Sequence, residues 1–351
     1  MRSRAREGTC LDELIELAVP VCQHAQQLIT RRGPGRKPAF ADWQMAVLIM
    51  VAIAKRKKSK SAQYRFLSEH WRLLVPTLGL SRWPTRSTYF QRYRAAHRLF
   101  ARAIAWHGQQ AVRYRWTDAT IVAVDKSLIA ACGPVESRRR HRRGVDSEAG
   151  WGISEHDGWV FGYGYEVVVA CGKEGVLWPI LASADRANRG ESITFRQKIG
   201  LLPRQTRYVL ADRGYDADDT CEAIEWPDHE HHSGRHFVCP TIQRYNARRP
   251  RRQAWKESRK RKRRRAHRER RKRFLQTKKG RELYALRSKT VEPFNAWFKQ
   301  LFELQDRIWH RGLANNQTLL SAAVLIYQIL LRINRKRNRT NGQIKWILDS
   351  M

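Results

Sequence analysis

Residues 208–216 read Tyr208-Val209-Leu210-Ala211-Asp212-Arg213-Gly214-Tyr215-Asp216. The apolar start of this stretch predicts a buried strand, and the Gly and Asp residues behind it predict a turn. Asp212 therefore stands where a buried strand ends, at a sheet edge that solvent can reach. Because an Asp in such a place is more often a turn former than a ligand, its assignment depends on other carboxylates nearby.

A second carboxylate, Asp125, follows the apolar run 121–124 and is predicted to end an interior strand in the same way. Adjacent strands of one sheet would bring Asp125 and Asp212 close together. Two such carboxylates repel each other, and a shared proton or a divalent cation stabilises them. Asp118 and Asp146 compete with Asp125, which is favoured over Asp118 because it ends the apolar run. Asp216 and Asp218 compete with Asp212, but a role at the N-terminus of the following helix is sufficient for them.

A third carboxylate, Glu292, is predicted to lie on a helix from about 289 to 305. Lys299 is seven residues further on and so lies within about 20° of the same helix face. The helix would dock on the sheet through a separate apolar face, and Pro293 is compatible with it in the first turn. Magnesium prefers oxygen ligands and bridges carboxylates to phosphates, so the three acids form a candidate metal site.

The charge of the chain favours a polyanionic partner. Lys and Arg number 69 against 32 Asp and Glu in 351 residues, for a formal net charge of +37. Such an excess predicts binding to nucleic acid rather than to a membrane, because the apolar stretches 45–54 and 319–333 fall short of the roughly 20 residues that a span needs. No secretory signal is evident, so we expect a cytoplasmic, nucleoid-associated protein.

The cysteines form no Cys-x-x-Cys pair, which argues against a zinc finger and a disulfide framework. One segment has a metal-like composition but reads as an exposed loop: His229, His231, His232, His236 and Cys239.

Residues 1–116 are predicted to form an all-α domain with helices at 11–29, 41–56 and from 61, the first kinked or split by Pro20. A further helix is predicted from about residue 86 through Ile104. With the turn before it, this helix forms a possible helix-turn-helix. The alternative is an ordinary basic face of a helical bundle. The candidates for reading DNA ends are Arg86, Gln91 and Arg92.

Residues 117–335 change to short apolar runs separated by Gly, Asp and Asn, which predict strands. The runs lie at 121–124, 159–161, 165–170, 176–181, 208–210 and 237–238. The first four are close enough in sequence to pair antiparallel, and helices at 192–202 and 217–224 would flank the later ones. A final apolar helix is predicted at about 316–333. The fold class is therefore α/β, a mixed sheet flanked by helices.

The stretch 244–281 holds 21 Lys or Arg and two acids in 38 residues. Self-repulsion should keep this basic insertion from packing as core until it meets phosphates. Residues 336–351 form a basic C-terminal tail.

Together these motifs resemble the DDE transposases of bacterial insertion sequences, whose catalytic domain has a ribonuclease H-like fold. Val-Ala-Val-Asp125, Leu-Ala-Asp212-Arg-Gly-Tyr-Asp and Tyr284-x2-Arg287-x4-Glu292-x6-Lys299 carry the resemblance, over roughly residues 117–335. The family signature has three residues between Arg and Glu, whereas this chain has four. Arg287 and Lys289 are therefore both candidates for the phosphate contact that the signature implies, beside Tyr284 and Lys299.

The resemblance implies that Asp125, Asp212 and Glu292 are catalytic and bind two Mg²⁺ ions, with Mn²⁺ as a possible substitute. It also implies cleavage of double-stranded DNA at the element ends, joining of those ends to target DNA, and a synaptic homodimer. Two alternatives remain open. One is a non-catalytic DNA-binding protein, either a decayed transposase or an architectural factor, and the other is a ribonuclease H-like nuclease without strand transfer.

Overall fold

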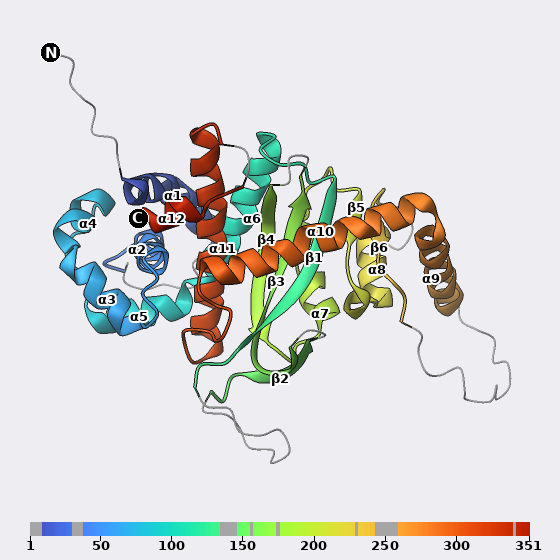
Figure 1. Ribbon diagram of the computed structural model, residues 1–351, viewed down its shortest axis with the longest axis horizontal. Helices are drawn as coiled ribbons and strands as arrows, with labels where there is room; N and C mark the ends of the chain where they lie inside the picture. Colours follow the sequence, from blue (N-terminus) through green and yellow to red (C-terminus); the bar gives the residue numbers. More distant parts are fainter. Residues whose placement is uncertain are drawn as a thin grey trace.

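A computed structural model describes residues 9–29, 38–133, 146–154, 157–172, 176–228, 231–242, 259–339 and 342–351. Its centre is a mixed sheet with helices on both sides (Figure 1). The strands are β1 (Ile121–Ala130), β2 (Gly150–Ser154), β3 (Gly158–Cys171), β4 (Leu177–Arg186), β5 (Tyr208–Leu210) and β6 (His236–Val238).

The strand order confirms the predicted fold class. β1 pairs antiparallel with β3 on one side and parallel with β5 on the other, while β4 pairs antiparallel with β3 and β6 parallel with β5. The short strand β2 adds to one end of β3. Three long antiparallel strands followed by two short parallel ones form a ribonuclease H-like sheet with β1 at its centre.

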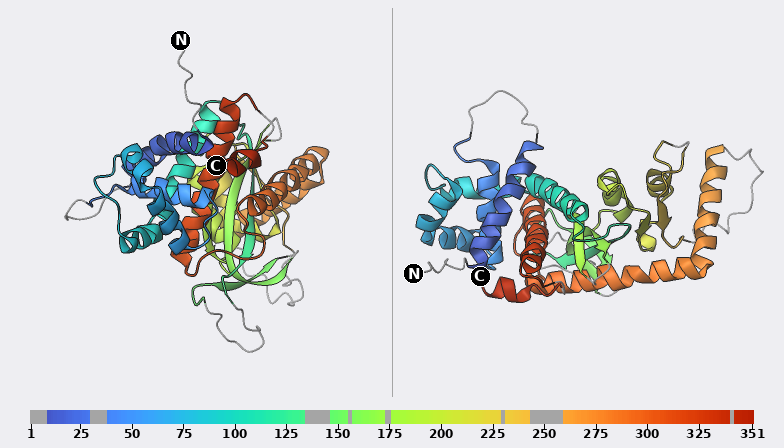
Figure 2. Two further views of the ribbon diagram at one scale, coloured as in Figure 1. Left: turned by 60° about the vertical axis from the view of Figure 1, so that its left-hand side comes forward. Right: turned by 90° about the horizontal axis from the view of Figure 1, so that it is seen from above.

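Six helices precede the sheet: α1 (Cys10–Gln27), α2 (Asp42–Ala54), α3 (Lys60–Glu69), α4 (Trp71–Leu78), α5 (Arg86–Ala95) and α6 (His97–Arg113). The later ones are α7 (Glu191–Arg196), α8 (Asp218–Glu225), α9 (Arg259–Gln276), α10 (Lys278–Leu301), α11 (Leu313–Lys336) and α12 (Lys345–Asp349), with 3-10 turns η2 (Ile199–Leu201) and η3 (Arg213–Tyr215). Figure 2 shows the N-terminal helices beyond α11, on the side away from β6 and α9.

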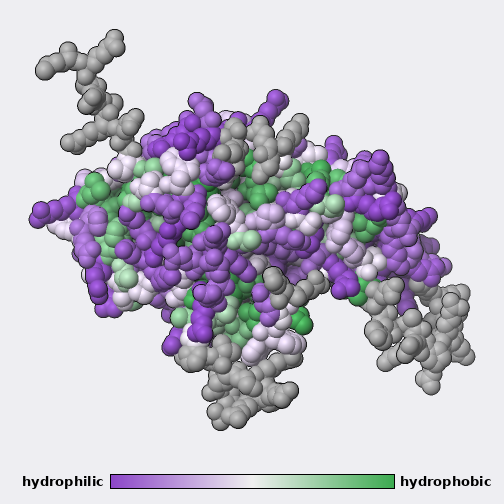
Figure 3. Space-filling view, in the orientation of Figure 1, coloured by the Kyte–Doolittle hydropathy of each residue, from purple (hydrophilic) through white to green (hydrophobic). Residues whose placement is uncertain are grey.

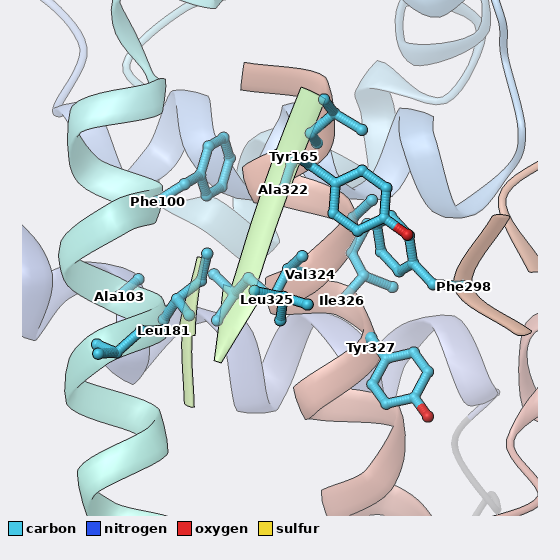
Figure 4. Close-up of a cluster of buried hydrophobic side chains, with 14 of the residues drawn as sticks. Phe100, Ala103, Tyr165, Leu181, Phe298, Ala322, Val324, Leu325, Ile326 and Tyr327 are labelled. Carbon is cyan, nitrogen blue, oxygen red and sulfur yellow. The ribbon is translucent and has the colours of Figure 1, made fainter. Parts of the chain in front are cut away.

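The core is continuous from the N-terminal helices to the sheet. α11 lies between them, and its side chains meet Phe100 of α6, Leu181 of β4 and Phe298 of α10 (Figure 4). α11 is also long and apolar enough to cross a membrane, but 89% of its apolar window is buried inside the protein. We therefore read α11 as the central core helix, as its sequence predicts, and the predicted boundary at residue 116 falls just after α6 within this shared core.

Two predicted strands, 159–161 and 165–170, form the single strand β3. Gly162 and Gly164 between them are typical of a turn, but here they allow close strand packing. A Cβ on Gly162 would lie 2.0 Å from the carbonyl oxygen of Ile129, and one on Gly164 would lie 2.3 Å from Cε of Lys126. These glycines mark the close approach of β1 to β3 rather than a chain reversal.

The helix predicted from residue 86 through Ile104 is broken into α5 and α6 at Ala96. Thr318 Oγ1 of α11 donates to the backbone carbonyl of Tyr93 and so supplies that carbonyl with a side-chain hydrogen bond at the break. Pro20 does not split α1, which runs through it as one helix.

The basic insertion packs better than its charge predicts. Residues 243–258 lie outside the described part, but α9 follows and lies against β6 and α10. Its arginines pair with acids on α8 or just before it: Arg263 and Arg264 with Glu222, Arg268 with Asp218, Arg270 with Glu225, and Arg271 with Asp216. The prediction that this segment would not pack as core holds for most of α9, which is largely exposed, but not for Arg271, which is buried. Local composition omits the acids that the fold brings to this helix.

A buried histidine in this core sets a pH dependence. His310 Nε2 lies 2.9 Å from the hydroxyl of Tyr93, and burial lowers the pKa of His310 from 6.5 to about 3. Below pH 6.5, His310 binds a proton in the unfolded chain but not in the folded chain. The free energy of unfolding therefore falls as the pH decreases, by up to about 1.4 kcal/mol per pH unit. Urea unfolding from pH 7 to 5 should show a smaller loss for His310→Gln than for wild type. Equal losses in the two proteins would contradict this.

Candidate active site

The three predicted acids meet at one guanidinium. Arg287 Nη2 lies 2.9 Å from Asp125 Oδ1 and 3.8 Å from Asp212 Oδ2, and its Nη1 lies 3.5 Å from Glu292 Oε1. The Asp125 and Asp212 oxygens both lie near Nη2, so the distance between them is at most the sum of their two distances to that nitrogen. The structure thus brings together Asp125, Asp212 and Glu292, which are up to 167 positions apart in the chain.

The strands explain how the two Asp residues meet. Asp125 is in the middle of β1, opposite Val167 of β3, and does not end its strand as predicted, because β1 continues to Ala130. On the other side, the parallel ladder with β5 stops at the pair Ala123 and Leu210. Asp125 therefore lies just past the end of β5, where the chain turns and presents Asp212.

α10 supplies the rest of the site from a helix that crosses the sheet over β1 and β3 (Figure 1). Its apolar face is buried, as predicted, through Val291, Phe294 and Phe298. Pro293 lies well inside α10 rather than in its first turn, because Thr277 caps the helix from an earlier start at Lys278. Pro293 is on the exposed side, where water can reach the carbonyl that it leaves without an amide partner.

Exposure rises across the three acids. The side chain of Asp125 is 15% exposed, that of Asp212 36% and that of Glu292 59%. Burial raises the pKa of Asp125 to about 6, the Arg287 guanidinium opposes this rise, and the Asp212 charge adds to it. Asn295 Nδ2 also donates to Asp125 Oδ2 at 2.8 Å. The site therefore has a buried floor and an open rim that a large substrate can approach.

A fourth carboxylate, Glu191, lies beside Asp212 and was not predicted. A Cβ built on Gly214 would be 2.0 Å from Glu191 Oε2 and 3.1 Å from Asp212 Oδ1. Burial, followed by the charge of Asp212, raises the pKa of Glu191 to about 8, and Lys126 opposes the rise. In sequence, Glu191 is an ordinary acid in the first turn of a helix, and only the tertiary packing of α7 reveals its neighbours.

The predicted phosphate-contact residues are placed differently from one another. Arg287 faces the acids, Lys299 Nζ donates to the backbone carbonyl of Leu128 at 2.8 Å, Lys289 is exposed, and Tyr284 is half-buried. Of the three basic residues among these four, Lys289 is the exposed one, and its side chain makes no hydrogen bond or ion pair with another described residue.

The predicted end-reading residues lie on α5. Gln91 is exposed, and Arg86 is exposed at the start of the helix, where it donates to Ser61 Oγ at 2.8 Å. Arg92 instead contacts Asp42 Oδ1 at 2.7 Å and the carbonyl of Phe40 at 2.6 Å. The guanidinium of Arg92 therefore ties α5 to the start of α2.

The competing acids have structural partners. Asp118 accepts from Thr120, and Asp146 accepts from the Tyr163 hydroxyl at 2.8 Å. Asp216 and Asp218 pair with Arg271 and Arg268 of α9. These contacts favour Asp125 and Asp212 as the acids left for chemistry.

The histidine-rich segment brings ligand atoms of Glu225, His232 and His236 within 4.8 Å of one another, while His229 lies outside the described residues. Gly234 N donates to His232 Nδ1 at 2.9 Å, so a neutral ring carries its proton on Nε2 and offers that nitrogen as a donor. Glu225 accepts from Phe237 N and pairs with Arg270. Glu225 is therefore already paired within the protein, whereas Nε2 of His232 is buried without a hydrogen-bond partner among the described residues.

The acids around Arg287 fit divalent cations better. All the donors are carboxylate oxygens, which Mg²⁺ and Mn²⁺ prefer, and Oε2 of Glu191 is buried without a hydrogen-bond partner in the described part of the chain. Arg287 already supplies one positive charge where the three predicted acids converge. The arrangement can hold metal ions at a sheet edge open to a phosphodiester.

Comparison with known proteins identifies the family of the chain. A family model described as "Transposase DDE domain" matches residues 116–329, a range that contains Asp125, Asp212 and Glu292. No match was found among curated proteins. Among solved structures, the chain is similar to the cryo-EM structure of a piggyBac transposase synaptic complex with hairpin DNA. The identity is 11% and the TM-score 0.41, over 97% of this chain and 78% of that chain.

Proposed function

The chain belongs to the transposase DDE-domain family, and from this premise we propose that it cleaves the ends of an insertion sequence and joins them to target DNA. The observation that carries the proposal is the convergence of Asp125, Asp212 and Glu292 on Arg287. Members of this family act on DNA with divalent metal ions. The family and the net positive charge of the chain together support a transposase that acts on nucleoid DNA in a bacterial cytoplasm.

In this proposal, Asp125, Asp212 and Glu292 hold two Mg²⁺ ions, for which Mn²⁺ can substitute. Bound there, the ions would lower the pKa of the attacking water or 3′-hydroxyl and stabilise the leaving oxygen. Asn295 orients Asp125, because its amide donates to Oδ2 and leaves the other oxygen toward Arg287. Asp212 keeps its turn through the hydrogen bond from Gly214 N at 2.9 Å.

Phosphate binding is proposed for the basic residues of α10. Lys289 is exposed about three turns before Lys299, whose Nζ already donates to a backbone carbonyl of β1. Arg287 shares its charge among three carboxylates, so cations at those carboxylates would free its guanidinium for a phosphate, with Tyr284 beside it. Lys289 would thus be available to a phosphate before metal ions bind, and Arg287 after they bind.

Recognition of the element ends is proposed for the N-terminal helices, with Arg86 and Gln91 as the exposed readers on α5. Arg92 would position that helix through Asp42. Joining two ends in one reaction calls for two copies of the chain, so we propose a homodimer on paired double-stranded DNA ends.

The test is incubation of the protein with Mg²⁺, labelled element ends and a target plasmid. We expect cleaved ends and ends covalently joined to the plasmid, because the same site can use water or a 3′-hydroxyl as the attacking group. Cleavage without joined products would support a nuclease. Binding without either product, in Mg²⁺ and in Mn²⁺, would support a non-catalytic DNA-binding protein.

The exposed cations of α9 should supply DNA affinity without sequence preference. Lys260, Lys262 and Arg273 are exposed along this helix, and Figure 3 shows hydrophilic side chains at this end of the molecule. Neutralising all three to Gln should weaken binding to terminal-repeat and random DNA equally and reduce the salt slope by up to about 0.9 per lost phosphate contact. Fluorescence anisotropy from 50 to 300 mM salt measures both. A loss confined to terminal-repeat DNA would make α9 a specificity element.

A further inference from the structure

Glu191 has the placement of a metal ligand rather than of a helix acid alone. α7 begins at Glu191, and its carboxylate faces the turn that carries Asp212. Gly214 lies next to both carboxylates. A Cβ added there would lie 2.0 Å from Oε2 of Glu191 and 3.1 Å from Oδ1 of Asp212. The two oxygens are thus separated by at most the sum of these distances. A glycine is required at 214 for the two acids to come this close.

One carboxylate oxygen of Glu191, Oε2, lacks a hydrogen-bond partner in the described part of the chain. Oε2 is buried and accepts no hydrogen bond from the residues that the structure describes. Lys126 is the nearby cation whose charge acts on Glu191, but its Nζ donates to the carbonyls of Ala187 at 2.8 Å and Arg189 at 2.6 Å. A buried carboxylate oxygen without a donor is costly unless a cation or a proton meets it.

The local charge points to a cation. Arg287 forms ion pairs with Asp125, Asp212 and Glu292, and Glu191 lies outside these pairs. The charges of Asp212 and Asp125 act on Glu191 and repel it, and Lys126 opposes them. Divalent ions that bind Asp212 would also reduce its repulsion with Glu191.

We propose that Glu191 is a fourth carboxylate ligand of the metal centre and binds the ion on the Asp212 side. The inference rests on the proposed function, since it adds a residue to the same site. Mg²⁺ and Mn²⁺ take six oxygen ligands, and two ions need more oxygens than three carboxylates supply without water. Glu191 would provide one such oxygen beside Asp212.

A purely structural role predicts something different. As an acid in the first turn of α7, Glu191 would stabilise the N-terminus of the helix and leave the metal affinity unchanged. Glu191→Gln keeps the shape of the side chain and removes its charge, so it separates the two roles. Glu282→Gln is the matched control, because Glu282 is exposed on α10 about three turns before Glu292.

The experiment is calorimetric titration of Mn²⁺ into the full chain without DNA. Glu191→Gln should weaken Mn²⁺ binding at least about tenfold, as loss of a ligand or its close support does, while Glu282→Gln binds as wild type does. Thermal melts with and without Mn²⁺ give a second reading on the same proteins. The Mn²⁺-induced rise in Tm should shrink in Glu191→Gln even if its metal-free Tm differs from wild type.

Asp212→Asn separates failure of this inference from failure of the proposed site. If Asp212→Asn weakens Mn²⁺ binding and Glu191→Gln does not, the metal centre stands and Glu191 is structural. If neither variant changes Mn²⁺ binding, the acids are not a metal centre and both proposals are overturned.

Discussion

Asp212→Asn is expected to reduce DNA cleavage at least about a thousandfold while DNA affinity stays within about twofold. The amide keeps an oxygen that can accept from Gly214 N, so the turn after β5 is retained. It removes the negative charge that a divalent cation needs, and a reaction that depends on bound metal loses its main stabilisation. Single-turnover cleavage of labelled element ends measures the rate, and a gel-shift titration measures affinity.

Asp219→Asn is the matched control, because it makes the same change seven residues along the chain. Asp219 is exposed on α8 and pairs with Arg196 and Arg264, away from the converging acids. Its cleavage rate should match wild type. Cleavage by Asp212→Asn at the wild-type rate would show that the second carboxylate of the site is assigned wrongly.

Arg271→Met should lower the free energy of unfolding by about 3–5 kcal/mol. Arg271 Nη2 lies 2.8 Å from Asp216 Oδ1, and their side chains are 3% and 2% exposed. Removing the guanidinium leaves the carboxylate buried without its partner, which is the costly way to break a buried ion pair. Urea unfolding followed by circular dichroism measures the loss.

Arg273→Met is the control on the same helix and should change stability by less than about 0.5 kcal/mol, because Arg273 is exposed. Adding Asp216→Asn to Arg271→Met should recover part of the loss, since the unpaired charge is then gone. A loss below about 1 kcal/mol for Arg271→Met would mean that the pair does not hold α9 to the turn beyond Asp212.

The sequence was sufficient to predict that the three acids lie near one another, and to predict most of the strands of the sheet. Asp212 and Glu292 stand in motifs whose strand or helix follows from local periodicity, and the strand of Asp125 was predicted although its length was not. A run that remains apolar for four residues and then turns polar suggests a strand end. Here the polar residues continue β1 because β3 pairs with it beyond the point where β5 stops.

Contacts between distant segments were out of reach of the sequence. The approach of Glu191 to Asp212 depends on how α7 packs, and no local pattern marks it. Arg271 is buried because it pairs with Asp216, 55 positions earlier in the chain. The composition of α9 alone does not reveal this pair. The pairing of Arg287 with three acids likewise requires the register between α10 and β1.

The most direct test of the central claim, that these acids are a metal centre, is anomalous scattering from crystals grown with Mn²⁺. The account predicts Mn²⁺ peaks within about 2.3 Å of carboxylate oxygens of Asp125, Asp212 and Glu292, with the Arg287 guanidinium moved off those oxygens. A well-ordered site in which Arg287 still bridges the three acids and no Mn²⁺ peak lies beside them would contradict it.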